Sequence, residues 1–166
     1  MSGAWPAILW GGLACGVLDI TQAFIAWGFE GATPFRILQG IAAGLLGRQS
    51  FQGGWPTAVL GGACHFLIAF GAAAVYYLAS RKIPFMTVHP VLAGMLYGEM
   101  VFWFMQYAVI PLSRTERRPY TDWALIITGP IGHMFLVGLP IALAVKIFAP
   151  ASIRLASIRP AGVRLG

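Results

Sequence analysis

Residues 61–77 read GGACHFLIAFGAAAVYY, an apolar stretch that is interrupted by one polar residue, His65. Small side chains recur around this histidine at helical spacing: Ala58, Gly61, Gly62, Ala69 and Ala72. Small residues on one face let two membrane helices approach closely. We therefore predict a membrane-spanning helix whose small-residue face, together with His65, points into the protein.

The composition indicates that the whole chain belongs in a membrane. Of its 166 residues, 58% are hydrophobic and 10% are charged, whereas a soluble domain carries roughly 25% charged residues. A helix crosses the hydrocarbon core of a bilayer in about 20 residues, so four crossings would occupy most of the chain. We expect the lipid bilayer as a partner. The net charge of +6 comes without a basic stripe that alternates with aromatic residues, so we expect no nucleic-acid partner.

The fold class that this pattern predicts is all-α, an integral membrane four-helix bundle forming a single domain over residues 1–150. The four spans are expected at about 5–29, 55–79, 90–112 and 123–148. A shorter helix at about 34–46 has Thr33 as its N-cap and Pro34 at its first position. It is too short to span, so we expect an amphipathic interfacial helix, with a re-entrant segment as the alternative. Residues 151–166 are predicted to form a basic C-terminal tail.

The loop charges favour one orientation of a multi-pass protein in the cell membrane. The side that holds both termini carries six basic residues: Arg81, Lys82, Lys146, Arg154, Arg159 and Arg164. The opposite side carries five: Arg36, Arg48, Arg114, Arg117 and Arg118. The positive-inside rule therefore favours cytoplasmic termini, by a difference of one charge. The first apolar run follows no basic n-region, so we interpret it as a retained helix and not as a signal peptide.

Each predicted span carries one ionisable residue about ten residues or more inside its ends. These residues are Asp19, His65, Glu99 and His133. A carboxylate at the centre of a bilayer costs about 2.5–3.5 kcal/mol, so Asp19 and Glu99 need partners or water. Gln22 shares a helix face with Asp19, and Gln106 shares one with Glu99. Four helices in up-down order would bring these side chains to one depth, so we predict a polar midplane cluster.

Several interpretations of this cluster remain open. The polar residues can be interhelical glue, since hydrogen bonds between membrane helices average about 0.6 kcal/mol. They can form a proton or ion path, because chains of Asp, Glu and His recur in relays and transporters. They can bind haem or a divalent metal through His65, His133, Asp19 and Glu99, although no spacing is a metal motif. They can also meet a partner membrane protein or a second copy of the chain.

We favour a small transport-like protein in which a proton or cation hops between carboxylate and imidazole groups, with His65 and His133 titrating. The alternative is a non-catalytic membrane subunit or scaffold of a larger assembly. We expect no enzyme activity, no catalytic residues and no bound cofactor. Ser113 has no base at a recognisable spacing, and the sequence has no Gly-rich phosphate loop and no CxxC motif.

Several short motifs resemble a known family. His65 is followed by an aliphatic and aromatic run that ends in RKIP at residues 81–84; the third span ends in IPL at 110–112, and GH stands at 132–133. Over residues 61–147 this pattern is similar to the YagU-type family of small bacterial inner-membrane proteins of unassigned function. The resemblance implies four helices in a bacterial inner membrane. It supports the positions of His65 and His133, adds nothing for Asp19 and Glu99, and supplies no substrate.

Overall fold

The computed structural model describes residues 3–116 and 123–148, with the backbone alone for 123–126. This described part is all-α and contains no strand. In chain order its elements are α1 (Ala4–Phe29), α2 (Pro34–Leu46), the 3-10 segment η1 (Gly47–Gln52), α3 (Gly54–Ser80), α4 (Phe85–Val88), α5 (Pro90–Phe104), the π segment η2 (Met105–Val109), α6 (Ile110–Leu112), α7 (Trp123–Gly132), the π segment η3 (His133–Gly138) and α8 (Leu139–Phe148). The predicted tail at 151–166, with Arg154, Arg159 and Arg164, lies outside the described residues, as do Arg117 and Arg118.

Within the described ranges, three continuous helices are long and apolar enough to cross a membrane. They are Ala4–Phe29 with 26 residues, Gly54–Ser80 with 27 and Ile127–Phe148 with 22. The chain is therefore a helical protein with candidate membrane spans, which indicates contact with a lipid bilayer. The remaining predicted span, 90–112, is helical throughout but is divided into α5, η2 and α6.

Both π segments end two residues before a proline. Pro111 follows η2, and Pro140 follows η3. Proline has no N–H group, and its ring clashes with the carbonyl of the residue four positions earlier. Widening the preceding turn to the π pattern relieves this crowding and lets the helix continue. Pro111 and Pro140 thus account for the two π segments, whereas Pro130, inside α7, is preceded by regular α-helix.

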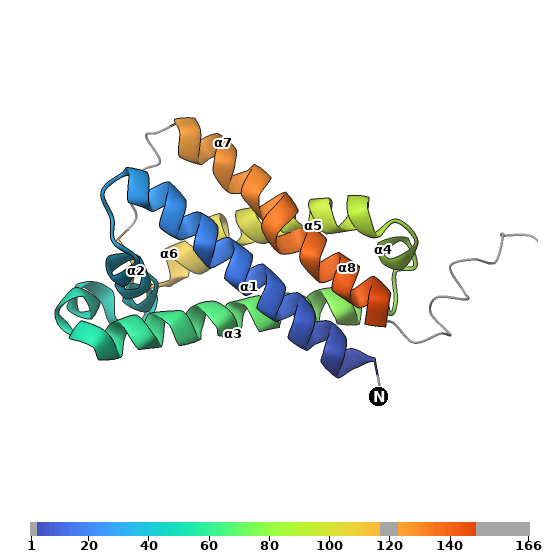
Figure 1. Cartoon of the computed structure of the whole chain (residues 1–166), viewed down its shortest axis with the longest axis horizontal. Helices are drawn as coiled ribbons and strands as arrows, with labels where there is room; N and C mark the ends of the chain where they lie inside the picture. Colours follow the sequence, from blue (N-terminus) through green and yellow to red (C-terminus); the bar gives the residue numbers. More distant parts are fainter. Residues whose placement is uncertain (1–2, 117–122, 149–166) are drawn as a thin grey trace, which may run out of the picture.

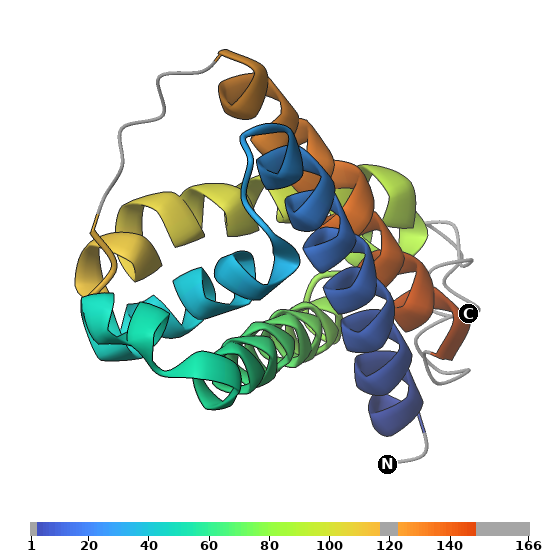
Figure 2. The same ribbon diagram turned by 60° about the vertical axis from the view of Figure 1, so that its left-hand side comes forward.

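The long helices cross obliquely. In Figure 1, α1 and the α7–α8 run lie diagonally, whereas α3 and α5 lie nearly horizontally. Contacts join α1 to both α3 and α8, and join α5 to both η3 and α8. The view in Figure 2 shows the same crossing, with α1 standing steeply against α3. Each long helix therefore meets different neighbours along different faces, which decides where its polar residues point.

Helix α2 follows the local signals in the sequence. Its N-cap Thr33 accepts a hydrogen bond from the backbone N–H of Arg36 at 3.3 Å, and Pro34 occupies its first turn. It ends at Gly47, whose φ of 63° is in the left-handed region that favours glycine. Its buried face packs on the first turns of α3, where Gln39 Nε2 donates to the Thr57 hydroxyl at 3.2 Å. The helix is therefore anchored to a span and does not stand apart from it.

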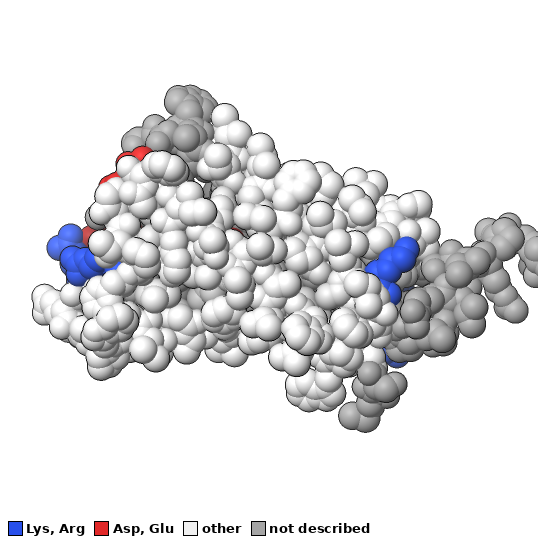
Figure 3. All heavy atoms as spheres, viewed as in Figure 1, with Lys and Arg blue, Asp and Glu red and all other residues white. Residues whose placement is uncertain are grey.

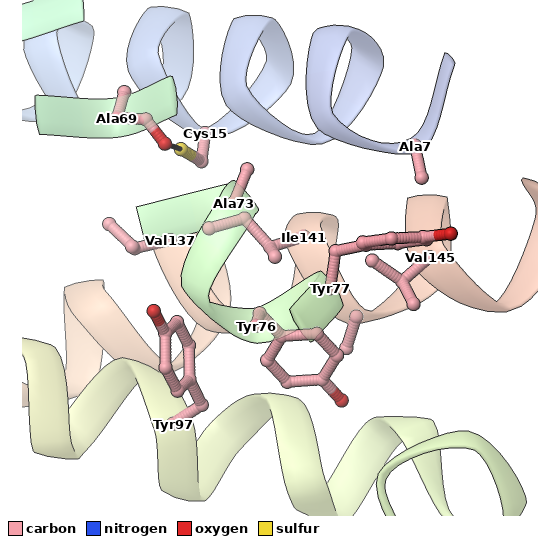
Figure 4. Close-up of a cluster of buried hydrophobic side chains, with 11 residues drawn as sticks. Ala7, Cys15, Ala69, Ala73, Tyr76, Tyr77, Tyr97, Val137, Ile141 and Val145 are labelled. Carbon is pink, nitrogen blue, oxygen red and sulfur yellow. Dashed lines mark hydrogen bonds between the residues drawn. The ribbon is translucent and has the colours of Figure 1, made fainter. Parts of the chain in front are cut away.

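A small apolar core holds α1, α3, α5 and α8 together. Figure 4 shows its side chains converging from these helices. Tyr76 and Tyr97 meet edge to face with ring centroids 5.0 Å apart. Their hydroxyls donate to the backbone carbonyls of Met86 at 3.0 Å and Ala72 at 2.7 Å. Polar atoms inside the core are thus paired, as burial requires.

The outer surface is apolar between two charged ends. Leu67, Val59 and Val75 on α3 are more than half exposed, as are many other large apolar side chains. Figure 3 shows Lys and Arg gathered at the two ends of the molecule, with a nearly uncharged belt between them. Among the described basic residues, Arg36, Arg48 and Arg114 belong to one end, and Arg81, Lys82 and Lys146 belong to the other. A belt of this kind is suited to hydrocarbon.

Candidate functional site

A polar pocket lies between α1, the α5–η2 run and the start of the last helical run. Its volume is about 140 Å³, which is room for several water molecules. Its walls carry both polar and aromatic side chains. The lining residues are Asp19, Gln22, Ala23, Ala26, Trp27, Phe102, Gln106, Thr128, Gly129 and His133. Four of the six residues predicted for the midplane cluster are therefore in this pocket.

The ionisable groups of the pocket are Asp19 and His133. The Asp19 Oδ1 and His133 Nε2 atoms are 3.9 Å apart, and the two side chains are 25% and 20% exposed. This separation is too long for a direct hydrogen bond, and it fits a carboxylate and an imidazole that share a water or close up by a small rotation. Along α1, Asp19 lies about 15 Å from the end at Phe29, at about 1.5 Å per residue. The pair therefore stands deep in the apolar belt.

The geometry fixes which nitrogen of His133 faces the carboxylate. Its Nδ1 atom lies 2.9 Å from the carbonyl oxygen of Gly129. A carbonyl oxygen can only accept a hydrogen bond, so Nδ1 carries a proton and donates it. In the neutral imidazole, Nε2 is then the unprotonated nitrogen, and it points toward Asp19. His133 is thus arranged to accept a proton on the side of the pocket.

Close backbone contact positions this histidine. On α5, Gly98 lies so near the carbonyl of His133 that an added Cβ would overlap the carbonyl oxygen. The ring of Phe102, one turn further on, meets the imidazole edge to face with centroids 5.1 Å apart. Two residues of α5 therefore hold η3 at the depth of Asp19.

The glutamine side chains Gln22 and Gln106 also line the pocket, and Gln22 links two of its helices. Gln22 Nε2 donates to the carbonyl of Thr128 at 3.3 Å, which joins α1 to α7. A Cβ at Gly132 would collide with the Gln22 side chain, so glycine at this position leaves room for the amide. Gln106 lines the pocket from η2. Trp27 and Thr128 line the part of the pocket that lies toward the Phe29 end of α1 and the Trp123 end of α7.

His65 is not among the pocket residues. Its Nε2 atom lies 2.8 Å from the carbonyl oxygen of Gly16 and donates to it, which joins α3 to α1. Gly16 and Asp19 are three residues apart on α1, so they are offset by about 60° around the helix axis. His65 thus reaches α1 from α3 one turn before Asp19, whereas His133 reaches α1 from η3 at Asp19 itself.

Glu99 is not among the pocket residues either. Its Oε1 atom accepts a hydrogen bond from the indole N–H of Trp103 at 2.6 Å. Because the preceding residue, Gly98, faces His133, Glu99 is turned about 100° away from that histidine. The single cluster predicted from the sequence is thus divided into a pocket and two separate polar positions.

Three pocket residues with large or polar side chains were not predicted to belong to the cluster: Trp27, Phe102 and Thr128. The signal in the sequence that could have identified pocket residues is their helical spacing from the polar residues already predicted for the cluster. Ala23 and Trp27 follow Asp19 at four and eight residues on one helix face, and Phe102 precedes Gln106 by four.

The described residues do not form a set of ligands that would hold a metal ion. Within residues 3–116 and 123–148, no group of three His, Cys, Asp or Glu side chains comes close enough to hold one. Of the four candidate ligands named from the sequence, His65, His133, Asp19 and Glu99, only Asp19 and His133 lie near each other among the described residues. A proton needs just one such pair, so proton chemistry suits this site better than metal binding.

No protein-family model, curated protein or solved structure matches this chain. The resemblance to the YagU-type family therefore stays a prediction.

Proposed function

We propose that the chain is a four-span membrane protein that moves protons, and that Asp19 and His133 act together as its proton-exchanging group. The three long helices support the multi-pass arrangement. The run Pro90–Leu112, formed by α5, η2 and α6, supplies the fourth span, since it is helical without a break and has the length that a bilayer requires.

The observation that carries the proposal is the pairing of Asp19 with His133 at the inner end of a polar pocket. Ionisable residues inside membrane segments are rare and usually mark ion or proton pathways. Here the Nε2 atom of the imidazole faces the carboxyl group of Asp19 at 3.9 Å. A proton that arrives through water in the pocket can be held by either group.

The pocket defines a direction of access. It extends from the Asp19–His133 pair toward Trp27 and Gln106, which lie near the ends of α1 and the α5–α6 run. These ends belong to the side opposite the N-terminus in a four-span arrangement. With cytoplasmic termini, as the loop charges predict, protons would enter the pocket from the outer side of the membrane.

Proton flux in liposomes tests this proposal. Purified protein is reconstituted with a pH-sensitive dye inside the vesicles, and a potassium diffusion potential drives proton entry. We expect flux above protein-free vesicles, and a reduction of at least tenfold in Asp19→Asn and in His133→Gln. His65→Gln is the matched control, since it alters a histidine at similar depth outside the pocket. Flux that is absent in the wild type, or unchanged in both variants, would overturn the proposal.

The hydrogen bonds of His65 and Gln22 favour a second candidate, a membrane scaffold held together by polar glue. Both side chains donate to backbone carbonyls of a neighbouring helix. In this case the polar residues set the register of helices that bind another membrane protein. A partner that copurifies in stoichiometric amount, together with proton flux no higher than in empty vesicles, would favour the scaffold.

A further inference from the structure

Glu99 is an ionisable residue of the proposed fourth span that the pocket does not use. It is the tenth residue of the run Pro90–Leu112, so it lies near mid-membrane in the proposed arrangement. Trp103 satisfies its Oε1 atom, but Oε2 is buried and has no hydrogen-bond partner within the described part of the chain. An orphaned carboxylate oxygen of this kind requires an explanation, such as a ligand or ion.

An aromatic surface continues outward from this carboxylate. The rings of Trp103 and Tyr107 are stacked, with centroids 5.5 Å apart and planes at 15°. Their side chains face outward, since the residues are 43% and 69% exposed. The face of an aromatic ring attracts a cation, most strongly for Trp and where water is excluded. Glu99, Trp103 and Tyr107, four residues apart in turn, thus form one aromatic–acidic face.

We infer that the aromatic–acidic face binds lipophilic organic cations that enter from the bilayer. The Glu99 carboxylate would supply the counter-charge, and the two rings would supply the contact surface. Because Oε2 is covered in this structure, binding requires the Glu99 side chain to turn outward as the indole of Trp103 moves. The inference uses the proposed fourth span but does not depend on the Asp19–His133 pair.

The chemistry of the face selects an organic cation over an inorganic one. A hydrated metal ion would need several oxygen or nitrogen ligands to replace its water. Within the described ranges, Glu99 belongs to no group of three His, Cys, Asp or Glu side chains. A cation whose charge is spread over alkyl or aryl groups sheds little hydration, and one carboxylate with two aromatic rings is then a sufficient site.

The same face is poorly shaped for a partner helix. Close packing of membrane helices uses small residues, whereas the outward side chains beside Glu99 are large: Leu96, Met100 and Phe104 are each more than half exposed. The small residues of α5 are already used, since a Cβ at Gly94 would come 2.8 Å from that of Ala142, and Gly98 meets His133. A small ligand therefore fits this face better than another chain.

Equilibrium dialysis with tetraphenylphosphonium tests the inference directly. The protein is studied in detergent or nanodiscs, and each variant is first checked by size-exclusion chromatography and circular dichroism. We expect saturable binding to the wild type, and at least tenfold weaker binding to Glu99→Gln. Trp103→Leu should bind several-fold more weakly, and it serves as a second variant if Glu99→Gln does not fold. His65→Gln, a polar change at similar depth, should bind like the wild type.

Three results would overturn the inference. The first is the absence of saturable binding to the wild type. The second is equal affinity in the wild type and Glu99→Gln. The third is binding that is lost in Asp19→Asn but retained in Glu99→Gln, which would place the cation in the pocket. If the wild type binds no cation and Glu99→Gln alters the molecular mass of the assembly, the face is an interface between chains instead.

Discussion

At the scale of single residues, the histidines of the two candidate spans, His65 and His133, meet different atoms. His65 donates to a backbone carbonyl of α1, whereas His133 presents one nitrogen to a carbonyl and the other to a carboxylate. The sequence places both at similar depth but cannot show the rotation of each helix. That rotation decides which histidine reaches Asp19.

The tautomers of the two histidines follow from these partners. We expect the neutral form of His133 to carry its proton on Nδ1 and that of His65 to carry its proton on Nε2, since those nitrogens face carbonyl oxygens. Nitrogen-15 NMR of histidine-labelled protein distinguishes the two tautomers, with His65→Gln and His133→Gln used for assignment. The opposite pattern would contradict the orientation of the rings.

Removing the His65 hydrogen bond should affect stability more than proton flux. We expect His65→Leu to destabilise the fold by about 0.6 kcal/mol and at most about 1.7 kcal/mol, the range measured for hydrogen bonds between membrane helices. Unfolding in a series of SDS mixtures measures this difference. Flux that falls as far as in Asp19→Asn, in a variant that remains folded, would show that His65 belongs to the proton site.

At the scale of elements, the hydrophobic pattern was sufficient to locate the helices. The helices α1, α2 and α3 begin and end within one residue of the predicted positions. Thr33 and Pro34 located the start of α2 because caps act locally. The π segments were not predicted. Their cause, a proline two residues later, is visible in the sequence, but the choice between a kink and a π turn depends on packing.

The contact between α5 and η3 should not accommodate a side-chain carbon at Gly98 without a loss of stability. In Gly98→Ala, the new Cβ would overlap the carbonyl of His133, so we expect a loss of about 1–3 kcal/mol, as for other overpacked sites. Gly71→Ala on α3 is the matched control, because a Cβ there meets nothing within 4 Å. That control should be neutral or gain up to about 1 kcal/mol from helix propensity. Equal stability of the two variants in SDS unfolding would contradict this contact.

At the scale of the whole molecule, composition and segment length predict a helical membrane protein, and the structure confirms an all-α chain with candidate spans. The sequence does not reveal which helices are neighbours. Up-down order brings Asp19, His65, Glu99 and His133 to similar depths, but oblique crossing gives each helix several faces. The predicted cluster was therefore divided, with Asp19 and His133 together and Glu99 turned toward Trp103.

Four spans require the two charged ends to lie on opposite sides of the membrane. In a background in which Cys15 and Cys64 are replaced by Ala, we expect Arg81→Cys to react with a membrane-impermeant maleimide only from the cytoplasmic side. Arg48→Cys should react only from the outer side. Arg48 pairs with Glu116 at 2.7 Å, but both side chains are exposed, so losing that pair should change stability little. Labelling of both from one side would exclude the four-span arrangement.

The central claim is that Asp19 and His133 form one proton-exchanging unit, and a double-variant cycle of proton flux tests it most directly. Residues that act as a unit lose function together, so their effects are strongly non-additive. We predict that Asp19→Asn with His133→Gln in one chain reduces flux no further than either change alone, within about twofold. Losses that multiply in the double variant would show two independent groups and would contradict the account.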